Sequence, residues 1–441
     1  GQSKEAIPEY AAARKLPGEY AGEALYREGF LNFQIKNYKE AAVLFGQFRN
    51  LYKQHRLWGA SGLSLGQAHL EDRQFKEADI VFTDLAKERG ANAGVALWHS
   101  RVFKRQKNYA GAAAILMPAV KQFRDDAMID KLLFDLAENL FGDQQYTESA
   151  SVFERLLKEH PKHGQRELIL RLSVQARFYT GRYAVGLALC ADYLEDFRKH
   201  PKASSVVFLQ GESQFFLEKY DDAVSTFEQF LKEYPDDVQV RAAQMHVGEC
   251  YFFGKQWKAA LAAFENLPGK KPEGRVFRQY NFIVGSCHYQ LKDWEQAVDS
   301  YQLFLSRFPK AQNADTALMN TGRALEEQKQ TDNALVVYEQ IAEDFPKSIY
   351  HSQAALKAGK IQFEGKQYAK ARAMLKSTAQ KKGDPNQPLA IYYLGFTEAE
   401  AGETDEAIVW LEQLAREFPK DPNASEARMK VGELQIIAEM F

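Results

Sequence analysis

Apolar residues recur along this 441-residue chain at spacings of three and four, and the strict alternation that is typical of strands is absent. This spacing predicts amphipathic helices from one end of the chain to the other. Some helices are also marked at their ends. Acidic residues such as Asp222 and Glu295 stand where a helix dipole is positive, and a proline follows where the helix should stop.

The helical pattern repeats with a period of 37 residues. In its clearest form a glycine, Gly211, is followed by Tyr220, Ala223, Phe227 and Pro235. The leading glycine recurs at Gly29, Gly66, Gly248, Gly285, Gly322, Gly359, Gly395 and Gly432, and three weaker units hold Ser100, Ala137 and Val174 in its place. Eleven units therefore fit between Gly29 and Gly432, with single steps of 34 and 36 as the departures.

Each unit is predicted to be a pair of helices joined by a turn. The small residue at the glycine position lets the two helices approach closely, and the alanine twelve residues later does the same from the partner helix. The aromatic residue four positions after that alanine fills the space between units.

This arrangement of small residue, aromatic, alanine, aromatic and proline resembles the tetratricopeptide repeat, whose unit has about 34 residues. The resemblance implies an all-α, right-handed superhelical solenoid of about eleven helix-turn-helix repeats with half-repeats at both ends. A single continuous solenoid is expected over residues 1–441. Residues 1–22 would form a partial repeat or cap, residues 23–425 the eleven repeats, and residues 426–441 a terminal helix.

The lengthened units end their second helices with Phe-Pro-Lys at 308–310, 345–347 and 418–420. In this they resemble bacterial envelope proteins of the TolA-binding-protein type and the lipoprotein subunit of the outer-membrane barrel assembly machine. That resemblance implies a role in cell-envelope assembly and a location in the bacterial periplasm or cell envelope, with the cytoplasm as the alternative. Because the chain starts at Gly1, an upstream signal, anchor or domain is left open.

Composition narrows the classes of partner. Lys and Arg total 57 against 59 for Asp and Glu, so no overall basic field attracts nucleic acid or an anionic membrane. The sequence lacks the roughly 18 to 20 successive apolar residues of a spanning helix, which argues against direct membrane insertion. Three cysteines are too few for a disulfide-stapled scaffold.

Motifs for catalysis, phosphate binding and metal binding are missing from the sequence. His160 and His163 stand at a predicted helix end, where the dipole favours a histidine, and are interpreted as structural rather than as metal ligands. We therefore expect no enzyme activity, no cofactor and no metal. The expected function is a protein–protein interaction scaffold, and the alternatives are a self-assembling structural solenoid or the non-catalytic arm of a larger protein.

The family resemblance also implies where a partner would bind. First helices of such repeats line a concave groove, and the residues six and three before the glycine position, and one and four after it, face inward. These positions hold aromatic and acidic residues, namely Phe134, Phe141, Phe178, Phe208, Glu212, Phe215, Glu249, Phe252, Phe282 and Tyr289. Buried aromatic anchors often dominate binding energy. The alternative is that these rings pack between neighbouring helices.

Charged residues accompany this aromatic series. Glu138 lies at another groove position, and Arg101, Lys104 and Arg105 are expected further back. The groove should therefore carry both signs of charge, and one or more protein partners are expected to bind there.

Overall fold

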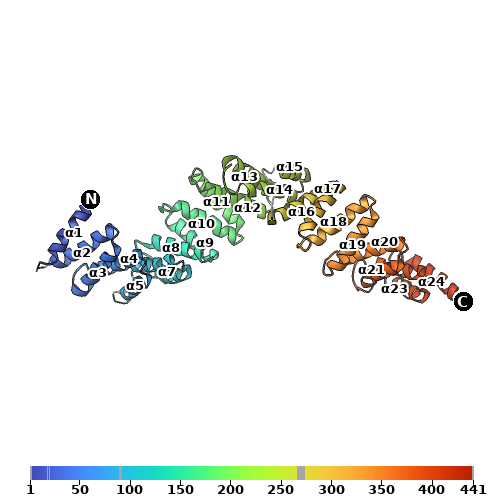
Figure 1. Cartoon of the computed structure of the whole chain (residues 1–441), viewed down its shortest axis with the longest axis horizontal. Coiled ribbons are helices and arrows are strands. Elements are labelled where there is room, and N and C mark those ends of the chain that lie inside the picture. The colour runs from blue at the N-terminus through green and yellow to red at the C-terminus, as the bar shows by residue number, and fades with distance from the viewer. Residues whose placement is uncertain (1, 17, 19, 89–91, 266–273, 440–441) are drawn as a thin grey trace. The chain divides into compact units, whose positions relative to one another are not determined.

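The computed structural model describes residues 2–16, 18, 20–88, 92–265 and 274–439, and within them it contains 24 helices and no strand (Figure 1). The all-α prediction is confirmed. The chain divides into two compact units, Gly1–Thr226 and Phe227–Phe441. We use first helix and second helix for the two members of each helix pair. The exact number of repeats and the single continuous solenoid stay predictions.

The N-terminal unit opens with α1 (Gln2–Ala13), which packs against α2. Its first helices are α2 (Tyr20–Gln34), α4 (Trp58–Glu71), α6 (Ala93–Arg105), α8 (Ile129–Gly142), α10 (Arg166–Tyr179) and α12 (Ala203–Phe216). Its second helices are α3 (Tyr38–Leu51), α5 (Phe75–Glu88), α7 (Tyr109–Gln122), α9 (Tyr146–Glu159), α11 (Tyr183–Phe197) and α13 (Tyr220–Glu233), and α13 contains the boundary between the units.

The C-terminal unit continues the same alternation. Its first helices are α14 (Val240–Phe253), α16 (Gly274–Leu291), α18 (Ala314–Glu327), α20 (His351–Glu364), α22 (Gln387–Glu400) and α24 (Ala424–Glu439). Its second helices are α15 (Trp257–Glu265), α17 (Trp294–Arg307), α19 (Thr331–Asp344), α21 (Tyr368–Ala379) and α23 (Thr404–Glu417).

Within each unit a helix packs chiefly against the helices just before and after it, and successive first helices also touch one another. The core is therefore a series of small clusters rather than one centre, as expected for a stack of repeats. The cluster of α18 and α19, for example, contains Leu318, Met319, Tyr338 and Ile341, each no more than 3% exposed.

The glycine positions bring the two helices of a pair together. A Cβ atom added to Gly66 would lie 2.5 Å from Cζ of Phe82, and one added to Gly322 would lie 2.5 Å from Cε1 of Tyr338. Real Cβ atoms do not approach so closely, so each ring occupies the space that a side chain would need. The predicted role of this position is confirmed at these two repeats.

The turn inside a pair uses a residue with left-handed backbone. Lys329 has φ of 61°, and the following N–H of Gln330 donates to the carbonyl oxygen of Leu325 at 2.8 Å. Glycine favours this conformation, but a lysine stands there in most of the repeats. No described helix is both long and apolar enough to cross a membrane.

Candidate partner-binding site

The predicted aromatic series lies at the surface of the cores rather than free in solvent. Phe208 is 5% exposed, and the other seven rings are half-buried. In α8, Phe134 stacks on the ring of His163 at 5.5 Å, and Phe141 meets Tyr146 edge-to-face at 5.2 Å. Both phenylalanines pack against the cluster formed with α7, α9 and α10.

Two further rings of the N-terminal unit also pack against neighbouring rings. Phe178 at the end of α10 contacts Tyr183 at 5.5 Å, and Phe215 at the end of α12 contacts Tyr220 at 5.7 Å. Each contact joins the last turn of a first helix to the first turn of its second helix. Glu212, also on α12, is half-buried.

In the C-terminal unit, Phe252 contacts Trp257 at 5.4 Å and Tyr289 contacts Trp294 at 5.5 Å, so the same helix-end contact recurs. Phe282 lies 5.6 Å from the ring of Phe304.

Glu249 differs from Glu212 because it is 5% exposed. One of its oxygens accepts a hydrogen bond from Nε2 of Gln279 at 2.6 Å, and the other lies 2.9 Å from Nδ1 of His246. This carboxylate therefore joins α14 to α16, the next first helix. The assignment of the whole predicted series as partner anchors stays a prediction.

The structure brings one further group of residues together on the first helices α4, α6 and α8. They surround a hollow of about 610 Å³ with Trp98 and Phe134 among its lining residues. Its wall also contains Leu70, Glu71, Arg101, Lys104, Arg105, Lys107, Tyr109, Asp135 and Glu138. We call this space the α4–α8 hollow. It combines apolar surface with charges of both signs.

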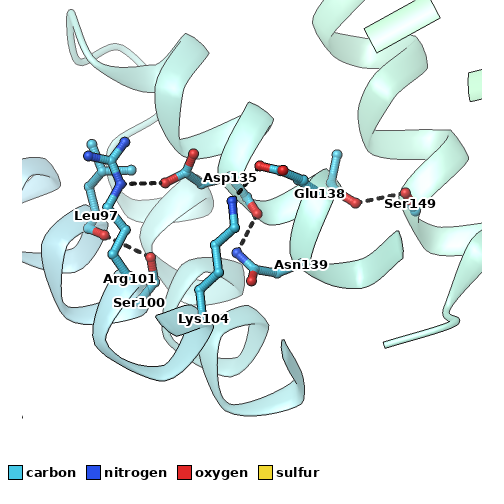
Figure 2. Close-up of polar contacts among 9 residues, drawn as sticks. Leu97, Ser100, Arg101, Lys104, Asp135, Glu138, Asn139 and Ser149 are labelled. Carbon is cyan, nitrogen blue, oxygen red and sulfur yellow. Dashed lines mark hydrogen bonds and ion pairs between the residues drawn. The ribbon is translucent and has the colours of Figure 1, made fainter. Parts of the chain in front are cut away.

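Ion pairs join the three helices around the α4–α8 hollow. Nε of Arg101 lies 2.9 Å from Oδ2 of Asp135, and Nζ of Lys104 lies 2.5 Å from Oε2 of Glu138 (Figure 2). The Arg101 guanidinium also lies 4.7 Å from the centre of the Trp98 ring. The positive side chains of α6 thus stand beside the acidic side chains of α8.

A third ion pair, between Arg105 and Glu71 at 3.1 Å, extends this arrangement to α4. Sequence reasoning missed Trp98, Asp135 and Glu71. A signal was present, because each of the three pairs joins opposite charges 34 residues apart. A search for opposite charges at this fixed 34-residue spacing would have found Asp135 and Glu71, whereas it would not have pointed to Trp98.

Hydrogen bonds inside the repeat hold this surface in place. Asn139 donates to the backbone oxygen of Asp135 at 2.6 Å, and the Ser149 hydroxyl donates across to α8 at the oxygen of Ala137, 2.8 Å away (Figure 2). Both side chains are buried. The first bond lies within α8, and the second ties α9 to α8.

The described residues include no cluster of three or more histidine, cysteine or acidic side chains arranged for a metal ion. Burial raises the thiol pKa of Cys190, Cys250 and Cys287 to about 12, so each is protonated at neutral pH and a poor nucleophile. All three are free thiols, as expected from the sequence.

Comparison with known proteins identifies the repeat. A tetratricopeptide repeat model matches residues 23–55, 131–163, 205–237, 281–311 and 316–348, and a second model of the same description matches residues 362–430. Together the matches span more than half of the chain. It belongs to the tetratricopeptide repeat family. Tetratricopeptide repeats support a protein-binding role, and their fold is generally a non-catalytic interaction scaffold.

Solved structures of the fold include a tetratricopeptide repeat protein from Parabacteroides merdae, 12% identical with a TM-score of 0.39, covering 61% of this chain and 98% of that one. The APC/C hetero-tetramer Cut9–Hcn1 is 15% identical with a TM-score of 0.29 and coverages of 96% and 87%. The structure of Naa15/Naa10 bound to HypK-THB is 12% identical with a TM-score of 0.39, and the match covers 99% of this chain and 76% of that one. A comparison with curated protein sequences finds no match.

Proposed function

We propose that this protein is a scaffold that holds a segment of a partner protein against its first helices, with the α4–α8 hollow as a principal site. The observation that carries the proposal is the combination, on three successive first helices, of a hollow of about 610 Å³, two half-buried aromatic rings and a rim of paired charges. A single segment crossing the hollow would touch several repeats at once.

The parts of the α4–α8 hollow have different tasks in this proposal. Trp98 and Phe134 give apolar area for an anchoring side chain, since aromatic rings bury much surface at low entropic cost. The Arg105 side chain is 59% exposed and the Lys104 side chain is 31% exposed. Neither charge is fully buried, so a partner carboxylate can approach either cation from solvent. The rim charges then set the register of the bound segment.

The experiment is affinity capture from the source cells, followed by chemical cross-linking to map the contact. The test variant is Lys104→Glu/Arg105→Glu. The matched control is Lys366→Glu/Lys370→Glu, which reverses two exposed charges in the C-terminal unit. A partner that cross-links to α4, α6 or α8 and is lost only from the test variant supports the proposal. Equal recovery by all three baits, with cross-links elsewhere, contradicts it.

We also propose that the partner belongs to bacterial cell-envelope assembly, on the basis of the 37-residue units with Phe-Pro-Lys after their second helices. Fractionation of the source cells tests this location directly. Recovery of the native protein with periplasm or membranes supports an envelope role, and recovery with the cytoplasmic fraction alone excludes it.

Self-association is the second candidate, and one observation favours it. Met429 and Ile436 on α24 are 70% and 62% exposed, and a Cβ added to Gly432 meets no described atom within 4 Å. The position that receives a ring or a leucine side chain from the second helix at Gly322, Gly359 and Gly395 is therefore open at Gly432. Sedimentation velocity over a hundredfold concentration range tests this, and a constant sedimentation coefficient would exclude it.

A further inference from the structure

A second groove lies in the C-terminal unit, between the second helices α21 and α23. Its volume is about 570 Å³, and Leu394 of the intervening helix α22 is among its lining residues. Val409 and Trp410 of α23 give it an apolar wall. Val409 is 62% exposed, whereas Trp410 is half-buried because it packs against the buried cluster of α20–α24. We call this space the α21–α23 groove.

Acidic side chains outnumber basic ones in the α21–α23 groove, with four carboxylates against two cations. One of the cations, Arg372, is already engaged. Its Nε donates to the two carboxylate oxygens of Glu398 at 2.8 Å, and its Nη2 lies 3.9 Å from Oε1 of Glu403. Asp405 and Glu406 are exposed and make no ion pair with any described residue. The wall formed by α23 therefore carries negative charge that has no cation of its own.

The free acids lie beside the apolar side chains along α23. Asp405 precedes Val409 by four residues, and Glu406 precedes Trp410 by the same interval, so each acid is a neighbour of an apolar side chain on the helix surface. A lysine or arginine side chain has the matching composition, because its apolar stem can cover Val409 or Trp410 while its charged head reaches the acid. The other cation of the groove, Lys376, stands on α21. The preference for a cation is therefore confined to the α23 wall.

A comparable groove between α17 and α19, with a volume of about 460 Å³, lacks this combination. Helices α19 and α23 both begin with Thr-Asp, which fixes their equivalent positions. The residues of α23 at three of these positions are Glu403, Glu406 and Trp410, and their counterparts before and within α19 are Gln330, Asn333 and Val337. The ring and the free acids thus distinguish the α21–α23 groove from another groove of the same kind.

The charges and the apolar wall together select the occupant. A phosphate-bearing or acidic ligand would meet the surplus of negative charge. A wholly apolar segment would cover carboxylates without pairing them, which is costly. The described acids are not arranged for a metal ion. A basic side chain satisfies both the acids and the ring.

We propose that the α21–α23 groove is a docking site for a basic segment of a partner protein, with a lysine or arginine side chain lying along Trp410 and Glu406. The site is in a different unit from the α4–α8 hollow, and the inference does not rest on the function proposed for that hollow.

The test measures binding of a rhodamine-labelled, nine-residue Gly/Ser peptide with three lysines to the full chain by fluorescence anisotropy. The same peptide with acetylated lysines keeps the stems but loses the charges, and spermine represents a small cation without a peptide backbone. We expect saturable binding of the lysine peptide, weakened by added salt, and none of the acetylated peptide. Absence of saturable binding, equal binding of the acetylated peptide, or tighter binding of spermine would overturn the proposal.

The variants exchange residues of this groove for those of the α17–α19 groove. Glu403→Gln/Glu406→Asn should weaken binding of the lysine peptide about fivefold to tenfold, and Trp410→Val about threefold. Glu295→Gln/Asp299→Asn removes the same charge from the lining of the α17–α19 groove and should bind the peptide like the parent protein. Circular dichroism checks the fold of each variant, and the two charge variants decide the matter if Trp410→Val is unfolded. Equal weakening by both charge variants would refute the assignment to this groove.

Discussion

The close approach of paired helices makes a sharp prediction at Gly322. A methyl group at this position would lie 2.5 Å from Cε1 and 2.8 Å from Cζ of Tyr338. The Tyr338 ring is fully buried, and so are Ile341 and Ala354 in the same cluster. The ring therefore cannot move into solvent, and about 1 Å of displacement must be taken up by the packed helices α18, α19 and α20.

The expected magnitude is a balance of two effects. Overpacking a tight core costs about 1–3 kcal/mol, whereas replacing glycine by alanine within a helix gains about 1 kcal/mol. Gly322→Ala should therefore lower the free energy of unfolding by about 1 kcal/mol, and by no more than about 2 kcal/mol. The same change at Gly432 should raise it by up to about 1 kcal/mol, because no described atom lies within 4 Å of the new methyl group.

Urea unfolding followed by circular dichroism compares the two variants with the parent protein. Repeat proteins can unfold in stages, so hydrogen exchange is measured as well, to place each change in α18–α19 or in α24. A lower urea midpoint for Gly322→Ala and an unchanged or higher one for Gly432→Ala are expected. A midpoint for Gly322→Ala above that of the parent would refute the reasoning from packing.

Three further predictions concern charges and thiols. Burial alone would raise the pKa of Asp384, but hydrogen bonds from the Ser352 hydroxyl and the Asn386 N–H outweigh it and lower the pKa to about 2. The stabilisation of the fold by ionised Asp384 is thus complete above pH 3.8 and is lost as the pH falls toward 2. Asp384→Asn should therefore make the free energy of unfolding less dependent on pH in that range, and an unchanged pH dependence contradicts this. Arg372→Ala leaves the carboxylate of Glu398, which is 5% exposed, without its cation, and should lower the free energy of unfolding in urea by about 2 kcal/mol. Arg372→Met/Glu398→Leu should recover most of that loss, and equal losses of stability in the two variants would refute the pairing argument. Because all three thiols are buried, a thiol reagent should label none of them in the native protein and all three in urea, and rapid native labelling would contradict the assigned burial.

The fold was predictable because the repeat fixes which residues meet. A glycine and an aromatic residue sixteen positions later, such as Gly322 and Tyr338, face each other because a helix, a turn and a second helix separate them by constant geometry. Their recurrence at a 37-residue period indicated the helix pairs without any knowledge of the structure. Burial of the three cysteines followed from the same alignment, because each occupies a position inside a helix pair.

The state of the groove aromatics was not predictable in the same way. Phe215 and Phe216 are adjacent on α12, yet the first is half-buried and the second is 51% exposed. Successive helix residues point about 100° apart, so exposure depends on the neighbouring helix and not on residue type. The family pattern selected the position of Phe215, and only the packing against Tyr220 shows how much of its ring is covered.

Two of the ion pairs around the α4–α8 hollow should contribute little to stability, which is compatible with the recognition role proposed for them. The Lys104–Glu138 and Arg105–Glu71 side chains are 26–59% exposed, and pairs of this kind contribute about 0–1 kcal/mol each. Yet they join three successive first helices, and the buried Ser149 hydroxyl ties α9 to α8, the helix that carries Glu138. A charge arrangement that adds little stability but is positioned this firmly can still align a charged partner and reject others. This reasoning makes reversal of Lys104 and Arg105 informative about binding rather than folding.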